Sequence, residues 1–121
     1  MALPVNHPFN NIIVSATTVD GTTGKTAGMR APCRGKIIKF SATLGAALAT
    51  SDCTATASIA GTAVTGGQLV LTQSGSAAGT TFTWLPTGAN TCNEDDAITI
   101  ALTGTATAGG HICFQAEIRP A

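Results

Sequence analysis

Residues 98–103 read Ile-Thr-Ile-Ala-Leu-Thr, and residues 112–119 read Ile-Cys-Phe-Gln-Ala-Glu-Ile-Arg. In both stretches a large or small apolar residue alternates with a polar or smaller one, which is a period of two. Successive side chains of a β-strand point to opposite faces of the sheet. Each stretch therefore predicts a strand with one buried face and one face toward water.

The same alternation extends through earlier parts of the chain. Residues 53–59 place Cys, Ala, Ala and Ile on one face and hydroxyl-bearing residues on the other. Residues 38–44 place Ile38 and Phe40 inward, followed by Ala42 and Leu44. Shorter strands are expected at residues 11–17, 68–72 and 80–85. Residues 29–32 show no such pattern and predict a loop.

Seven or eight short strands separated by glycine-rich turns indicate an all-β protein. We expect an antiparallel jelly-roll-like β-sandwich over residues 11–121, with an immunoglobulin-like sandwich as the second candidate. Residues 1–10 contain two prolines and no alternation. They predict a short extended N-terminal arm, which is either a loose terminus or a segment lying on a neighbouring subunit.

Small residues dominate the composition. The 121 residues include 21 Ala, 21 Thr and 14 Gly, whereas 28 are large and apolar and 10% are charged. This supports one core and argues against disorder. A net charge of zero lacks the basic footprint of a nucleic-acid-binding protein. The sequence contains no apolar run of about 18 residues, so no membrane span is predicted. The first residues do not resemble a secretory signal.

The sequence offers no complete catalytic or cofactor motif. Thr23–Thr26 resembles the end of a phosphate-binding loop, but Val19 stands where that motif needs glycine. His7 and His111 have no Cys, Asp or Glu at metal-ligand spacing. No serine lies in a nucleophile elbow. We therefore expect no enzyme activity, no cofactor and no metal.

Four cysteines are separated by 20, 39 and 21 positions, so none forms the closely spaced pair of a zinc site. Two disulfides could form in three connectivities. Without a predicted secretory signal, reduced thiols are the expected state. The cysteines are Cys33, Cys53, Cys92 and Cys113.

Charge is concentrated in two places. Five of the six basic residues fall within positions 25–39, and we call Arg30, Arg34 and Lys36 the basic segment. We call Glu94–Asp96 the acidic cluster; it directly precedes a predicted strand. The cluster is either a solvated turn or a contact surface, since a calcium site would need further oxygen ligands. In a symmetric oligomer the two groups could form complementary patches between subunits.

Trp84 is the single tryptophan and lies at a predicted strand end, before Leu85 and Pro86. A core or interface position is expected for it. Sugar-binding surfaces generally use exposed aromatic faces. An exposed Trp84 beside a groove would therefore indicate a carbohydrate-binding module.

Glycine-rich turns and charged strand entries follow one another in a recognisable order. The segments are 31–39, 60–67, 73–79, 86–91, 94–96 and 116–119. This order resembles the small head decoration, or cement, proteins of tailed bacteriophages, over roughly residues 30 to 119.

The resemblance implies a jelly-roll-like sandwich that binds the outer surface of the virion head as a homotrimer and clamps neighbouring major capsid protein subunits. It implies production in the host cytoplasm. The net charge and the lack of a long apolar run predict no nucleic-acid and no membrane partner. A carbohydrate-binding module and a tail or fibre component are the alternatives. The residues expected at capsid or subunit contacts are Leu3, Pro4, Val5 and Phe9 of the arm, Arg30, Arg34 and Lys36 of the basic segment, and Glu94, Asp95 and Asp96 of the acidic cluster.

Overall fold

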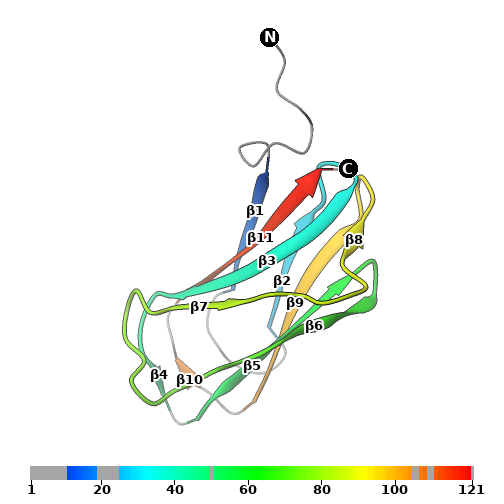
Figure 1. Ribbon diagram of the computed structural model, residues 1–121. Coiled ribbons are helices and arrows are strands. Elements are labelled where there is room, and N and C mark those ends of the chain that lie inside the picture. The colour runs from blue at the N-terminus through cyan, green and yellow to red at the C-terminus, as the bar shows by residue number, and fades with distance from the viewer. Residues whose placement is uncertain (1–10, 19–24, 50, 105–106, 109–110, 121) are drawn as a thin grey trace.

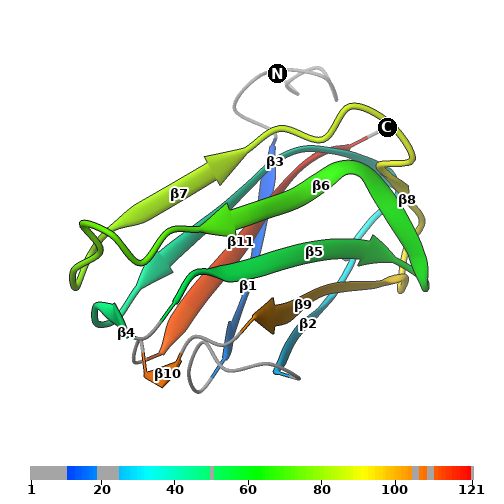
Figure 2. The same ribbon diagram turned by 90° about the horizontal axis from the view of Figure 1, so that it is seen from below.

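The computed structural model describes residues 11–18, 25–49, 51–104, 107–108 and 111–120. They form two antiparallel sheets packed as a sandwich (Figures 1 and 2). The first sheet contains β1 (Ile12–Thr18), β3 (Gly35–Leu44), β7 (Thr81–Trp84), β8 (Thr91–Cys92) and β11 (Ile112–Pro120). The second contains β2 (Thr26–Arg30), β5 (Cys53–Ile59), β6 (Thr62–Leu71) and β9 (Ala97–Gly104). A small third sheet pairs β4 (Leu48–Ala49) with β10 (Thr107–Ala108).

The chain crosses repeatedly between the two large sheets. The spatial order is β1-β11-β3-β7 in the first, where β8 also pairs with β3, and β2-β9-β5-β6 in the second. Within these sheets, β5–β6 and β7–β8 are the consecutive pairs that stay in one sheet. This confirms the predicted antiparallel jelly-roll-like sandwich. The arm predicted for residues 1–10 lies outside the described residues.

The alternating segments become strands because each has one apolar face to bury. In β5, Cys53, Ala55, Ala57 and Ile59 face the core, as the pattern predicts. The inward residues of β9 and β11 are also buried. The outward positions of β5 are Thr54, Thr56 and Ser58, and β-branched threonine suits an extended backbone. No helix among the described residues is long and apolar enough to cross a membrane.

Two predictions about strands were wrong. A loop was expected at residues 29–32, but Met29 and Arg30 are the last two residues of β2. Within that strand, Ala27 and Met29 face the core. Gly28 between them has no side chain and obscures the alternation. At the start of β3 a register shift against β11 leaves Ile38 half-buried and places Ile37 in the core. The inward residue there is therefore Ile37 rather than Ile38, because a β-bulge moves the pattern by one position.

The strand β6 is longer than the predicted segment 68–72. It starts at Thr62, after a two-residue turn in which Ala60 has φ +50° and Gly61 has φ +86°. Two positive φ angles define the turn type that matches the twist of a hairpin. The turn joins β5 and β6 directly.

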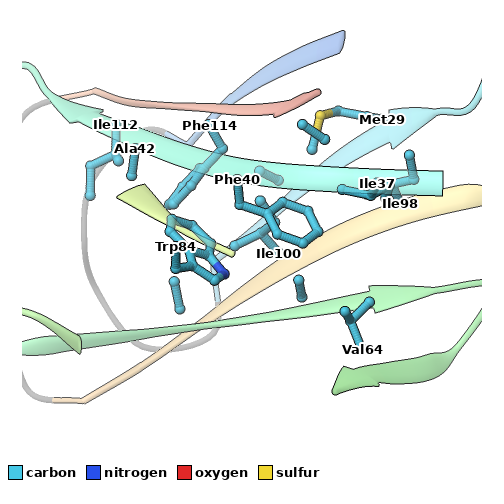
Figure 3. Close-up of a cluster of buried hydrophobic side chains, with 14 of the residues drawn as sticks. Met29, Ile37, Phe40, Ala42, Val64, Trp84, Ile98, Ile100, Ile112 and Phe114 are labelled. Carbon is cyan, nitrogen blue, oxygen red and sulfur yellow. The ribbon is translucent and has the colours of Figure 1, made fainter. Parts of the chain in front are cut away.

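The core lies between the sheets and includes the aromatic rings of Phe40, Trp84 and Phe114 (Figure 3). Phe40 of β3 and Trp84 of β7 are direct partners across the ladder, and their rings stack with centroids 5.4 Å apart. Trp84 is 6% exposed, which confirms the expected core position. Isoleucines of both sheets belong to the same buried cluster.

Candidate functional site

One end of the sandwich collects most of the charged residues, and we call it the charged end. The ladders place the start of β3 beside the end of β11 and beside β8, because Gly35 is opposite both Pro120 and Cys92. The end of β2 and the start of β9 meet through Arg30 and Ala97. Figure 1 shows these strand ends grouped around the end of β11.

The first sheet carries a positive surface at this end. Lys36 of β3 lies directly opposite Arg119 of β11, and both are exposed together with Arg34. Farther along the same two strands, Lys39 of β3 lies opposite Glu117 of β11. Like charges facing each other across a ladder are unfavourable on their own. An anionic surface placed against Lys36 and Arg119 would relieve that repulsion.

The acidic cluster forms the turn between β8 and β9. The Asp96 carboxylate accepts a hydrogen bond from the backbone N–H of Asn93 at 2.9 Å, and Asp95 has φ +72°. Asp95 also forms an ion pair with Arg30. This pair is well exposed, so it contributes little to stability. Glu94 projects into solvent.

Backbone hydrogen bonds hold the two charged groups together. The Ala31 N–H donates to the Asp96 carbonyl at 2.9 Å, and the Asp95 N–H donates to the Ala31 carbonyl at 2.8 Å. The Arg30–Asp95 ion pair therefore satisfies part of the charge within one chain. Among the described residues, Arg34, Lys36 and Glu94 form no ion pair. All three side chains are exposed.

Two cysteines also belong to the charged end. The Cys92 thiol lies 3.8 Å from the Cys33 carbonyl oxygen, to which it donates a weak hydrogen bond. Burial raises the pKa of the Cys92 thiol, and burial likewise raises the pKa of Cys53 in the second sheet. The structure has no disulfide between any of the four cysteines, and their reduced state stays a prediction. Within the described part of the chain, no group of His, Cys, Asp and Glu side chains could hold a metal ion.

A polar hollow of about 220 Å³ lies on the outward face of the first sheet. It is lined by Ile13, Lys39, Ser41, Thr81, Thr83, Gln115 and Glu117. None of these side chains is aromatic, and Trp84 is buried on the opposite face of β7. Sequence reasoning missed the hollow because it needs four strands that are distant in the chain. The strand pairing brings its lining residues together, because Ile13 lies opposite Glu117 and Ser41 lies opposite Thr83.

The second sheet presents a different outward surface, which we call the threonine face. Thr54, Thr56 and Ser58 of β5 and Thr99, Ala101 and Thr103 of β9 line its centre. These side chains are small and uncharged. They have few rotamers to lose when another surface covers them.

The structure thus brings the basic segment and the acidic cluster to one place. It places Arg30 against Asp95 and leaves Arg34, Lys36 and Glu94 exposed beside them. The predicted contact residues Leu3, Pro4, Val5 and Phe9 lie outside the described residues. Asn11 directly precedes β1, whose first residue is opposite Ile118, so the described chain enters the sandwich at the charged end.

No protein-family model and no curated protein matches the chain. Several solved structures share its fold. One chain from the capsid asymmetric unit of cyanophage Pam1 matches with a TM-score of 0.58 and 18% identity, over 100% of this chain and 93% of that one.

Two carbohydrate-cleaving enzymes match over a smaller part of their own length than the capsid chain does. An arabinoxylan arabinofuranohydrolase of glycoside hydrolase family 43 from Bacillus subtilis, solved with cellotetraose, gives a TM-score of 0.56 and 17% identity, over 95% of this chain and 22% of that one. An exo-β-1,3-galactanase from Phanerochaete chrysosporium matches with a TM-score of 0.50 and 16% identity, over 88% of this chain and 26% of that one. The chain thus spans about a quarter of these enzymes. At such identities the likeness establishes the β-sandwich fold.

Proposed function

We propose that the protein decorates the outer surface of a phage head as a homotrimer and stabilises contacts between major capsid protein subunits. The observation that carries this proposal is the end-to-end likeness to a chain of the cyanophage capsid asymmetric unit. That match covers 100% of this chain and 93% of the capsid chain. The matches to the enzymes cover one portion of much larger chains.

The charged end is the proposed contact surface. In a trimer with cyclic symmetry, each copy presents one surface to the next copy and a different surface to the previous one. Glu94 of one copy can then approach Arg34 and Lys36 of its neighbour, or these groups can approach capsid subunits. The arm residues Leu3, Pro4, Val5 and Phe9 are proposed to extend this contact. Complementary charge fixes the orientation of such a contact more than its strength.

The threonine face supports the same role. A sandwich with few large apolar residues has a limited core, and association adds burial that the isolated chain lacks. Flat sheets of Thr, Ser and Ala lose little conformational entropy on packing. Binding to the assembled shell alone would stabilise that shell by linkage, and many copies would add their effects.

The test is the stability of heads of the encoding phage, prepared without the chain and then supplied with it. We expect added protein to raise the temperature at which the heads release DNA. The double variant Arg34→Glu/Lys36→Glu is expected to lose this effect, while Lys25→Glu, a basic residue outside the charged end, retains it. Equal release temperatures with and without the wild-type chain would contradict the proposal.

The carbohydrate-binding alternative receives less support from the site. An exposed Trp84 beside a groove would favour it. In the structure Trp84 is buried and stacks on Phe40. The polar hollow and the likeness to the Bacillus subtilis enzyme remain as its arguments. Titration with neutral oligosaccharides distinguishes it from decoration. A tail or fibre component would instead assemble into an elongated particle.

A further inference from the structure

Two cysteines at the charged end lie on neighbouring segments, and the sulfur of one contacts the backbone of the other. Cys33 lies in the bend before β3, and Cys92 is the last residue of β8, 59 positions later. Gly35 is the ladder partner of Cys92, and the Cys92 sulfur lies 3.8 Å from the Cys33 carbonyl oxygen. Both cysteines therefore occupy the same small region of the fold.

Hydrogen bonds on either side fix this arrangement. On one side, the Ala31 N–H donates to the Asp96 carbonyl at 2.9 Å. On the other, the Ile37 N–H donates to the Asn90 carbonyl at 2.8 Å, and the Asn90 side-chain amide donates to the Ile37 carbonyl at 2.6 Å. The segment that carries Cys33 is thus tied to the segment that carries Cys92 before and after the thiols.

The other cysteines do not share this arrangement. Cys53 starts β5 and faces the core from the second sheet, whereas Cys113 is an outward residue of β11 in the first sheet. Of the pair at the charged end, Cys92 is fully buried and Cys33 is partly exposed. A dissolved oxidant can therefore reach Cys33 first.

We propose that Cys33 and Cys92 are a redox modification site and form an intramolecular disulfide with a small-molecule disulfide such as oxidised glutathione. The Cys33 thiolate attacks one glutathione sulfur, and the other glutathione leaves as its thiolate. Cys92 then loses its proton to solvent and attacks the Cys33 sulfur, which releases the second glutathione. The two protein thiols are oxidised, one glutathione disulfide is reduced, and the two thiol protons pass to solvent or to the released thiolates.

The consequence is a covalent staple between the basic segment and the turn that carries the acidic cluster. In a reducing cytoplasm both thiols stay free, and in an oxidising medium outside the cell the staple closes. Cross-linking distant parts of a chain restricts the unfolded state and so stabilises the fold. The inference does not depend on phage decoration, since it concerns the isolated chain.

The experiment incubates the purified full-length chain with oxidised glutathione at pH 8 and measures intact mass and Tm, before and after dithiothreitol. We expect wild type to lose the mass of two hydrogen atoms and to gain on the order of 10 °C in Tm, both reversed by dithiothreitol. Cys33→Ser should show neither change. The matched control Cys113→Ser, also at a half-buried cysteine, should behave as wild type.

A loss of two hydrogen atoms by Cys33→Ser would overturn the proposal, because a different pair would then be reacting. Wild-type protein that stops at glutathione adducts, or that forms cross-linked dimers instead, would also overturn it. Cys92→Ser provides a second check where the variant folds. Since Cys33 is partly exposed, its serine variant keeps the test decisive even where Cys92→Ser does not fold.

Discussion

A single methyl group at Gly35 should disrupt the charged end. Gly35 begins β3, is buried, and pairs with both β11 and β8. A Cβ atom there would lie 2.5 Å from the Arg119 carbonyl oxygen and 2.9 Å from the Ile118 Cγ2 atom. The nearer atom is backbone and cannot rotate away. Gly35→Ala therefore forces β3 and β11 apart where Lys36 and Arg119 are displayed.

The size of the effect follows from this geometry. Inserting a methyl group into a packed site destabilises by about 1–3 kcal/mol, and weakening one ladder hydrogen bond adds about 1 kcal/mol. We expect a loss of about 3 kcal/mol in the free energy of unfolding. With a urea m-value of about 2 kcal/mol/M, the unfolding midpoint falls by about 1.5 M.

The assay is urea unfolding followed by the fluorescence of Trp84, at one fixed protein concentration because association shifts apparent stability. Gly28→Ala is the matched control. A Cβ atom at Gly28 would meet no heavy atom within 4 Å, and the backbone there has no positive φ. At that position, alanine should be neutral or stabilising by about 0.5 kcal/mol, because it restricts the unfolded chain. Equal midpoints for the two variants would refute the reasoning.

Further predictions concern the core, the acidic turn and the thiols. Phe40→Ala should lower stability by about 3–5 kcal/mol in the same assay, since it leaves a cavity beside the stacked indole; a loss below about 1 kcal/mol would contradict this. Asp95→Gly should leave the midpoint unchanged or raised, because it removes a weak exposed ion pair but relieves φ +72°; a clear drop would show that the ion pair matters. Thiol-reagent kinetics should show Cys33 reacting faster than Cys53 and Cys92, whose raised pKa values leave little thiolate at neutral pH. Stability should also fall above pH 9, because the unfolded thiols ionise there while the buried ones resist; a flat profile at alkaline pH would contradict this.

The fold class was predictable because it depends on local alternation. Ile98, Ile100 and Leu102 must share a face in any strand, so their burial follows directly from the sequence. The bulge at Ile38 was not predictable, because it exists only relative to the register of β11. The strand that contains Gly28 was not predicted, because glycine has no side chain and so does not contribute to an alternating pattern.

The candidate site was predictable as residue groups but not as a surface. The sequence identifies the basic segment and the acidic cluster separately, and it leaves open whether they meet within one chain or between chains. The ion pair of Arg30 with Asp95 depends on β2 and β9 being neighbours. Strand order is set by the packing of the whole sandwich and is not encoded in any short segment. The closeness of Cys33 to Cys92 has the same origin.

The measurement that tests the central claim most directly is co-sedimentation of the purified chain with expanded phage heads of the kind the proposal assigns it to, prepared without the chain. The account predicts saturable binding at a fixed ratio to the major capsid protein, with the bound copies present in multiples of three. It also predicts that Arg34→Glu/Lys36→Glu binds more weakly than Lys25→Glu. A chain that stays in the supernatant at every concentration would contradict the account.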